Sequence, residues 1–167
     1  MKKSNLHIGT KTILAIAMSL GDYNKHQGWT IPADQNPEDE GYLVEYQDGG
    51  KANHPNHKGY ISWSPKAVFD NAYQDVTKGV SFGAAIQLAR LGYKIARSGW
   101  NGSGMFAYIV PKNKYPVTSP GSPIKGVYEN DMVPYREYWA LKTAQNDIAT
   151  WAPSGSDSLA NDWIIVE

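Results

Sequence analysis

The stretch Ser81–Met105, SFGAAIQLARLGYKIARSGWNGSGM, decides how the second half of the chain folds. Ser81 can accept from the free N–H groups of a first helical turn, and Gly92 can end that helix in the left-handed conformation. Between them, apolar residues recur at the three- and four-residue spacing that places side chains on one helix face. The residues of this predicted core face are Phe82, Ala85, Ile86 and Ala89.

A strand, a turn and a second strand follow the predicted helix. Residues 93–97 alternate in polarity and predict a strand, and residues 105–111 predict the next one. The glycine-rich turn between them carries Trp100 and Asn101. The C-terminal stretch 151–167, WAPSGSDSLANDWIIVE, repeats these ingredients, with small polar residues ahead of a tryptophan in an apolar strand. We expect these two pieces to build a small-molecule pocket.

The sequence predicts an α+β fold in which small antiparallel β-sheets pack with short helices, in two modules of residues 1–78 and 79–167. Residues 112–134 show no clear periodicity and predict a long loop that a function or a partner orders. The remaining expected elements are strands at 11–18, 41–46, 59–63, 136–144, 148–151 and 162–167, a helix begun by Ser19, a helix capped by Ser64 with Pro65 as its first residue, and a helical turn near 153–159.

The amino-acid composition argues against several classes of protein. Lys plus Arg and Asp plus Glu number 16 each, so the net charge is zero, which argues against affinity for a nucleic acid polymer. The chain has no cysteine, so it has no disulfide, thiolate zinc site or cysteine nucleophile. The apolar run 13–20 is short and follows a polar segment, unlike a signal peptide, and no stretch reaches the length of a membrane span. We therefore expect no membrane partner and no secretion.

The motif RSGWNGSGMF, the preceding FGAAIQLARLGYKIAR and the terminal PSGSDSLANDWIIV resemble the type-two Thoeris anti-defence proteins over about residues 80–167. The resemblance implies a phage protein that acts in the host cytoplasm as a homo-oligomer, a tetramer in that family. It implies a small-molecule partner, a cyclic ADP-ribose isomer made by a bacterial TIR-domain enzyme, or for some members a cyclic oligonucleotide. It also implies that the protein sequesters this signal without degrading it, and that it uses no cofactor.

The first module resembles a different family of small phage proteins of unknown function. The shared pattern is GW-x-IP near residue 28, then NP-x-DEGYLVEY, and then SWSPK near residue 62. This resemblance implies no activity. The chain therefore resembles a fusion of two phage modules.

A nucleotide-like ligand needs an aromatic face for its base and a guanidinium or N–H groups for its phosphates. Trp100, Asn101 and Arg97 offer such groups on and beside the glycine turn. Local chemistry alone favours a simpler interpretation, in which Trp100 fills the core of a tight hairpin and Arg97 faces solvent. The resemblance favours ligand binding instead.

The remaining candidate ligand-binding residues also have structural alternatives. Ser154, Ser156 and Asp157 offer groups for ribose hydroxyls, but helix capping uses the same residue types. Phe82 and Met105 fit a core as well as they fit a ligand contact or an oligomer interface.

We expect no metal site and no catalytic residue. His54 and His57 stand three residues apart, but the sequence shows no third ligand near them, and a catalytic zinc usually takes three protein ligands. The sequence has no phosphate-binding P-loop, no G-x-S-x-G elbow and no Cys/His dyad. The alternative to a sequestering protein is a phage structural or host-interaction adaptor that acts through the first module. A weaker alternative is an enzyme that degrades the same signal.

Overall fold

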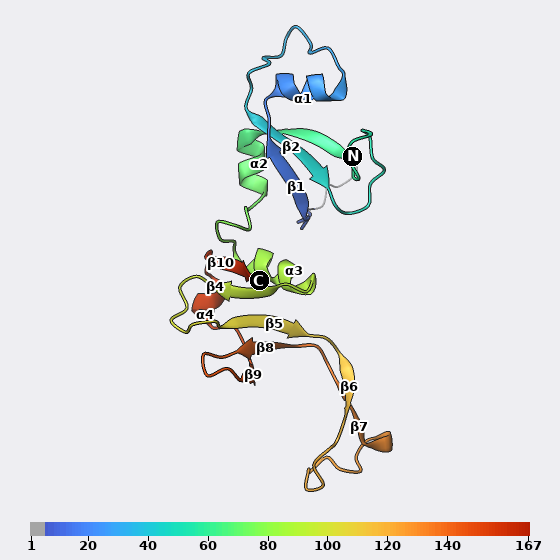
Figure 1. Ribbon diagram of the computed structural model, residues 1–167, viewed down its shortest axis with the longest axis vertical. Helices are drawn as coiled ribbons and strands as arrows, with labels where there is room; N and C mark the ends of the chain where they lie inside the picture. The colour runs from blue at the N-terminus through green and yellow to red at the C-terminus, as the bar shows by residue number, and fades with distance from the viewer. Residues whose placement is uncertain (1–5) are drawn as a thin grey trace. The chain divides into compact units, whose positions relative to one another are not determined.

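The computed structural model describes residues 6–167, and the chain divides into two compact units, one ending at Tyr73 and the other beginning at Gln74 (Figure 1). The first unit holds one antiparallel sheet of order β1-β2-β3. The second unit holds a five-stranded sheet of order β10-β4-β5-β8-β9 and a two-stranded ribbon, β6-β7. With its short helices, this is the expected α+β fold. Among the described residues, no helix has the length and apolar character that crossing a membrane requires.

The first unit packs a helix against the three-stranded sheet. Ser19 caps α1 by accepting from the Asp22 N–H at 3.1 Å, as predicted. Tyr23 of this helix is buried against Leu43 and Ile61 of the sheet. The elements of the unit are β1 (Ile13–Ala17), α1 (Leu20–Gln27), β2 (Gly41–Tyr46), β3 (Ile61–Pro65) and α2 (Lys66–Ala72).

Two expectations for the first unit are wrong. Ser64 does not cap α2, because Ser64 pairs with Tyr42 inside β3 and Pro65 takes the N-cap position without a side-chain hydrogen bond. His54 and His57 do have a third imidazole near them. The Nε2 atom of His26, in the last turn of α1, lies 2.9 Å from Nε2 of His57.

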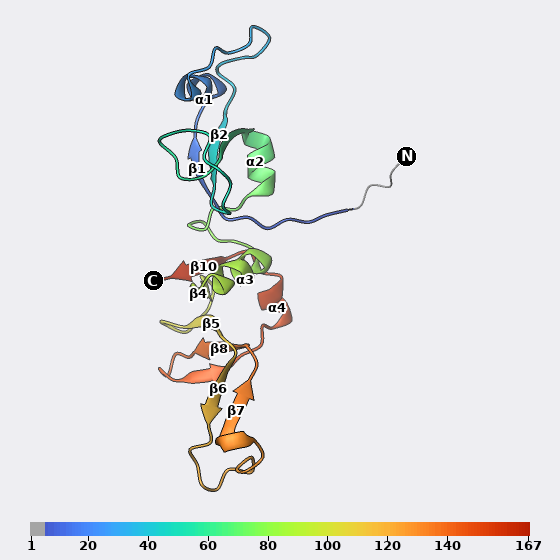
Figure 2. The same ribbon diagram turned by 90° about the vertical axis from the view of Figure 1, so that its right-hand side faces the viewer.

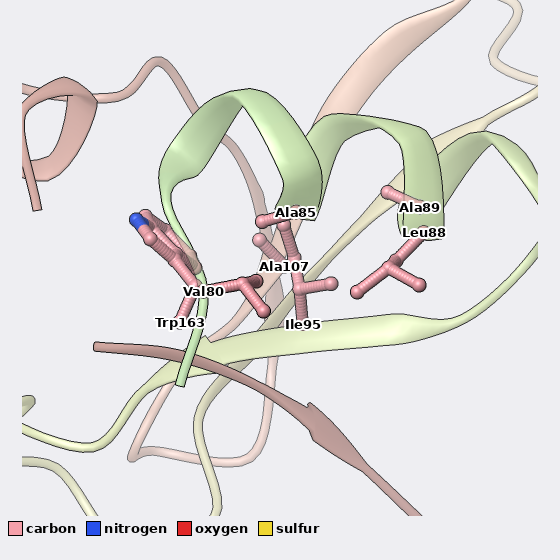
Figure 3. Packing of buried hydrophobic residues seen from close by; sticks show 7 residues of the cluster. All are labelled: Val80, Ala85, Leu88, Ala89, Ile95, Ala107 and Trp163. Atoms are coloured by element: carbon pink, nitrogen blue, oxygen red, sulfur yellow. The ribbon is translucent and has the colours of Figure 1, made fainter. Parts of the chain in front are cut away.

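The second unit has its core between α3 and the five-stranded sheet (Figures 2 and 3). In Figure 3 the α3 side chains face strands β4 and β5, and Trp163 of β10 closes one end of the cluster. The seven buried residues are Val80, Ala85, Leu88, Ala89, Ile95, Ala107 and Trp163. The elements are α3 (Phe82–Arg90), β4 (Lys94–Arg97), β5 (Phe106–Val110), β6 (Asn113–Pro116), a 3-10 turn (Glu129–Asp131), β7 (Met132–Tyr135), β8 (Tyr138–Lys142), β9 (Ile148–Thr150), α4 (Gly155–Ser158) and β10 (Trp163–Val166).

Helix α3 begins and ends where the sequence predicts. The Ser81 hydroxyl accepts from the Ala84 N–H at the start of α3. Gly92 follows the helix with a φ of 95°, a left-handed conformation that favours glycine. The backbone of Val80 pairs with Trp163, which connects the segment ahead of α3 to the last strand.

The expectation of a long loop over residues 112–134 is wrong in part, because both ends of this segment form strands. Figure 1 shows the chain continuing beyond β5 and β8 as the narrow ribbon β6-β7. The edge-to-face contact of Tyr115 with Tyr135 joins its strands, with ring centroids 5.8 Å apart. All four residues of β6 are exposed, so the strand lacks the one-sided apolar pattern by which sequence reveals a strand.

Candidate functional site

Asp157 connects the two segments from which the pocket was predicted. It lies in α4, and its buried carboxylate accepts from the Arg97 guanidinium at 3.1 Å and from the Trp100 indole N–H at 3.3 Å. The sequence places these residues far apart, and the fold brings them together because β10 pairs with β4. We call Arg97, Trp100 and Asp157 the anchor cluster.

Arg97 is ion-paired within the chain, so the alternative in which it only faces solvent is wrong. Its Nε donates to Asp162 at 2.8 Å, and its Nη1 donates to Asp157. The same Asp162 accepts from the Gly99 N–H at 3.0 Å and thereby fixes the start of the glycine turn. Two of the guanidinium nitrogens are thus paired with carboxylates within the chain, and the side chain stays 23% exposed.

Trp100 packs as part of an aromatic cluster, in line with the structural alternative. Its ring lies edge-on to Trp151 and Trp163, with centroids 6.0 and 5.5 Å away. Phe82 joins the same cluster, 5.1 Å from Trp163. Trp100 and Phe82 are only partly buried. Part of each ring therefore stays accessible at the margin of the core.

The small polar residues form a cap whose outer groups face solvent. Ser154 and Asp157 make a capping box, in which the Ser154 Oγ accepts from the Asp157 N–H at 3.1 Å and Oδ2 accepts from the Ser154 N–H at 3.1 Å. Ser156 is exposed, and its hydroxyl lies 2.9 Å from that of Ser154. The capping alternative is therefore correct for Ser154 and Asp157, while Ser156 remains accessible.

The glycine turn carries the predicted site residue Asn101 and leads into the predicted site residue Met105. Asn101 is exposed, and Met105 is half-buried. A Cβ at Gly102 would lie 2.1 Å from the Met105 Sδ, so the turn closes tightly over this methionine. Asn101 is thus available to a ligand, and the half-buried Met105 packs against Gly102.

The groups around Arg97 favour the ionised form of both carboxylates that pair with it, Asp157 and Asp162. The Arg97 guanidinium and the Gly99 N–H hold the pKa of Asp162 below its usual value, against the opposing effect of burial. Burial raises the pKa of Asp157, but hydrogen bonds from Ser154, Arg97 and Trp100 outweigh it and lower that pKa overall. Both aspartates are therefore charged at neutral pH, and together with Arg97 they form an ionic network within the chain.

A hollow of about 310 Å³ lies elsewhere in the second unit, and none of the eight predicted site residues lines it. Aromatic rings and one cation shape it, with Lys94 Nζ 5.4 Å from the centre of the Phe106 ring. Sequence reasoning missed this hollow. The available signal was the aromatic pair Phe106 and Tyr108, which share one face of a strand. Its lining residues are Ala89, Gly92, Tyr93, Lys94, Phe106, Tyr108, Ile109 and Ile148.

Comparison with known proteins identifies the second unit. The profile of the Thoeris anti-defense 2-like domain matches residues 80–166. The curated protein Thoeris anti-defense 2 of Bacillus phage SP01 is 39% identical over 87 residues, which cover 52% of this chain and 94% of that protein. The chain belongs to the Thoeris anti-defense 2-like family. This membership supports a phage anti-defence role.

The anti-defence domain contains every residue that the sequence singled out for ligand binding, because all eight lie within the matched residues 80–166. It also contains the 310 Å³ hollow. The three-stranded unit that ends at Tyr73 lies outside the match.

Proposed function

We propose that the anti-defence domain binds a cyclic ADP-ribose isomer, or a related cyclic nucleotide signal, and withholds it from the host effector without degrading it. The protein acts in the host cytoplasm, and its site combines the accessible part of the Trp100 ring with Asn101, Ser154 and Ser156. A second copy of the chain supplies the opposite wall. Family membership supports the anti-defence role, and the anchor cluster is the observation that supports this location.

The anchor cluster gives the site the rigidity that sequestration needs. A protein that competes with a receptor needs nanomolar affinity, which corresponds to about −12 kcal/mol. Ordering side chains on binding reduces affinity, and groups that are already fixed avoid this cost. Trp100 is held by Asp157 and by two neighbouring rings before any ligand arrives.

The exposed groups suit the riboses and the base of such a ligand. Serine hydroxyls and the Asn101 amide can both donate and accept, as ribose hydroxyls require. An aromatic face adds about 1–3 kcal/mol per stacked base. Since Asp157 and Asp162 occupy two of the Arg97 donors, the phosphates in this proposal contact the remaining Arg97 donors, backbone N–H groups or the second copy.

Titration calorimetry of the full chain with a cyclic ADP-ribose isomer tests the proposal. Asn101→Ala and Ser156→Ala change exposed side chains, so we expect unchanged melting and a Kd at least about tenfold weaker, the equivalent of 1.4 kcal/mol. Ser119→Ala, at an exposed position of the ribbon loop, is the matched control and leaves the Kd unchanged.

A Tyr108→Ala variant separates the two possible locations within the same domain. Tyr108 lines the 310 Å³ hollow, whereas Arg97, Trp100 and Asp157 of the anchor cluster do not. Loss of binding in Tyr108→Ala together with full binding in Asn101→Ala would assign the ligand to the hollow and overturn the proposed location. Absence of binding to the wild-type chain would overturn the proposed ligand class.

A further inference from the structure

The unit outside the family match contains a cluster of three histidines. His26 comes from the last turn of α1, and His54 and His57 come from the loop between β2 and β3 (Figure 1). One ring nitrogen from each lies within 4.8 Å of the others, and all three residues are partly buried. The histidines approach one another through the fold, because α1 packs its Tyr23 against Ile61, just beyond that loop.

His57 is held with one nitrogen directed into the cluster. Its Nδ1 donates to Oε2 of Glu45 at 2.7 Å, and its Nε2 lies 2.9 Å from Nε2 of His26. The hydrogen bond to a carboxylate favours the tautomer in which the lone pair is on Nε2, where it faces His26. This carboxylate–histidine arrangement is the one that orients and strengthens metal-binding imidazoles.

Glu45 is itself rigid. It lies in β2, the central strand of the sheet, where it pairs with Leu14 on one side and Ile61 on the other. Its Oε1 accepts from the N–H groups of Lys58 and Gly59 at 3.1 and 3.0 Å. The carboxylate therefore fixes both the His57 ring and the end of the loop that carries it.

His54 completes the group. Its ring stacks on that of His26 with centroids 4.2 Å apart, and its Nε2 donates to the backbone carbonyl of His26 at 3.1 Å. Its Nδ1 accepts from the Asn56 N–H at 3.2 Å. Coordination exchanges one of these hydrogen bonds for a metal bond, and the other can keep the ring in place.

We propose that His26, His54 and His57 bind one divalent transition-metal ion of the zinc class, with Glu45 as the positioning residue for His57. Imidazole nitrogen suits zinc, copper and nickel, and the absence of a carboxylate ligand disfavours calcium and magnesium. Zn–N bonds of about 2.0–2.1 Å in tetrahedral geometry place ligand nitrogens about 3.4 Å apart. The His26–His57 separation of 2.9 Å opens by about half an ångström to meet this geometry.

The ion would join α1 to the loop between β2 and β3 and would leave a fourth position for water or another ligand. This proposal concerns the first unit and does not depend on the proposed function of the anti-defence domain. A simple hydrogen-bonded histidine network, without metal affinity, is the competing interpretation of the same contacts.

Metal titration of the full chain distinguishes the two interpretations. The protein is stripped with a chelator and titrated with Zn²⁺ against a chromophoric competitor, and with Co²⁺ to record its absorption bands. We expect one Zn²⁺ per chain, four-coordinate Co²⁺ bands and a higher melting temperature with Zn²⁺, because a ligand that binds only the folded state stabilises it. Each of His26→Gln, His54→Gln and His57→Gln removes these responses.

His7→Gln is the matched control, because His7 is exposed and lies outside the cluster, so it retains full binding. Glu45→Gln keeps the three ligands and weakens affinity by about 10- to 100-fold, the usual effect of losing such a partner. Absence of stoichiometric Zn²⁺ binding by the wild-type chain, or equal binding by the wild-type chain and the three histidine variants, would overturn the proposal.

Discussion

Removing the Asp157 carboxylate is expected to destabilise the anti-defence domain selectively. Asp157→Ala deletes the acceptor for Arg97, Trp100 and the Ser154 N–H at once. Loss of a helix cap costs about 1 kcal/mol, and hydrogen bonds to a charged group contribute about 1.5–3 kcal/mol. The Arg97 side chain is 23% exposed and can regain water, so we take the lower end of that range.

The expected sum is about 2–3 kcal/mol, which lowers the melting temperature of a domain of this size by roughly 10–20 °C. Asp157→Asn keeps an oxygen for Arg97 and Trp100 but cannot keep every acceptor of the capping box, so we expect about half of this loss. Calorimetry measures the total, and hydrogen exchange resolved by peptide assigns the loss to residues 74–167.

Glu137→Gln is the matched control. Glu137 pairs with Arg90 at 3.6 Å, and both side chains are more than half exposed. Exposed pairs contribute little, so we expect a change within about 0.5 kcal/mol. If Asp157→Ala were as stable as this control, Asp157 would not organise the two segments and the account of the anchor cluster would be refuted.

Three further predictions concern Asp162, Trp163 and Gly59. Because the pKa of Asp162 is lowered in the folded chain, its stabilising effect is complete above the unfolded pKa of about 4 and is lost as pH falls through the folded pKa. Asp162→Asn should therefore make the stability of the chain depend less on pH in acid unfolding followed by circular dichroism, and an unchanged pH dependence would contradict this. Trp163→Ala empties a fully buried site and should cost about 3–5 kcal/mol in chemical denaturation, so a loss below 1 kcal/mol would mean that this ring is not in the core. Gly59→Ala brings a Cβ to 2.1 Å from the Tyr46 carbonyl oxygen and should lower the free energy of unfolding by about 1–3 kcal/mol, whereas Gly9→Ala meets nothing within 4 Å and should leave it unchanged. Equal melting temperatures for the two variants would refute the steric reasoning.

Local patterns predicted the elements of this protein well. The Ser19 and Ser81 caps, the Gly92 terminus and the alternation in β4 and β5 are decided by residues within one or two turns of each other. The predicted core face is wrong at Ile86, which is only partly buried and lies outside the core cluster. The buried residues Ala85, Leu88 and Ala89 follow the three- and four-residue spacing, so the core face includes Leu88 in place of Ile86.

The long-range partners of polar side chains could not be predicted, because they depend on how distant strands and helices come together. Arg97 carries no local sign that β10 will place Asp162 beside it. His26 is separated by 31 residues from His57, and only the packing of α1 brings their rings together. The ribbon β6-β7 was missed for a related reason, since its strand β6 has no buried face.

The central claim is that the anti-defence domain captures a cyclic nucleotide signal intact. The most direct measurement incubates the full chain with a stoichiometric amount of the cyclic ADP-ribose isomer, removes free ligand by filtration, denatures the protein by heat and analyses the released small molecule by mass spectrometry. We expect the wild-type chain to retain the intact isomer and to release it on heating, and we expect Asn101→Ala to retain less. Recovery of a cleaved product, or passage of all the isomer through the filter, would contradict it.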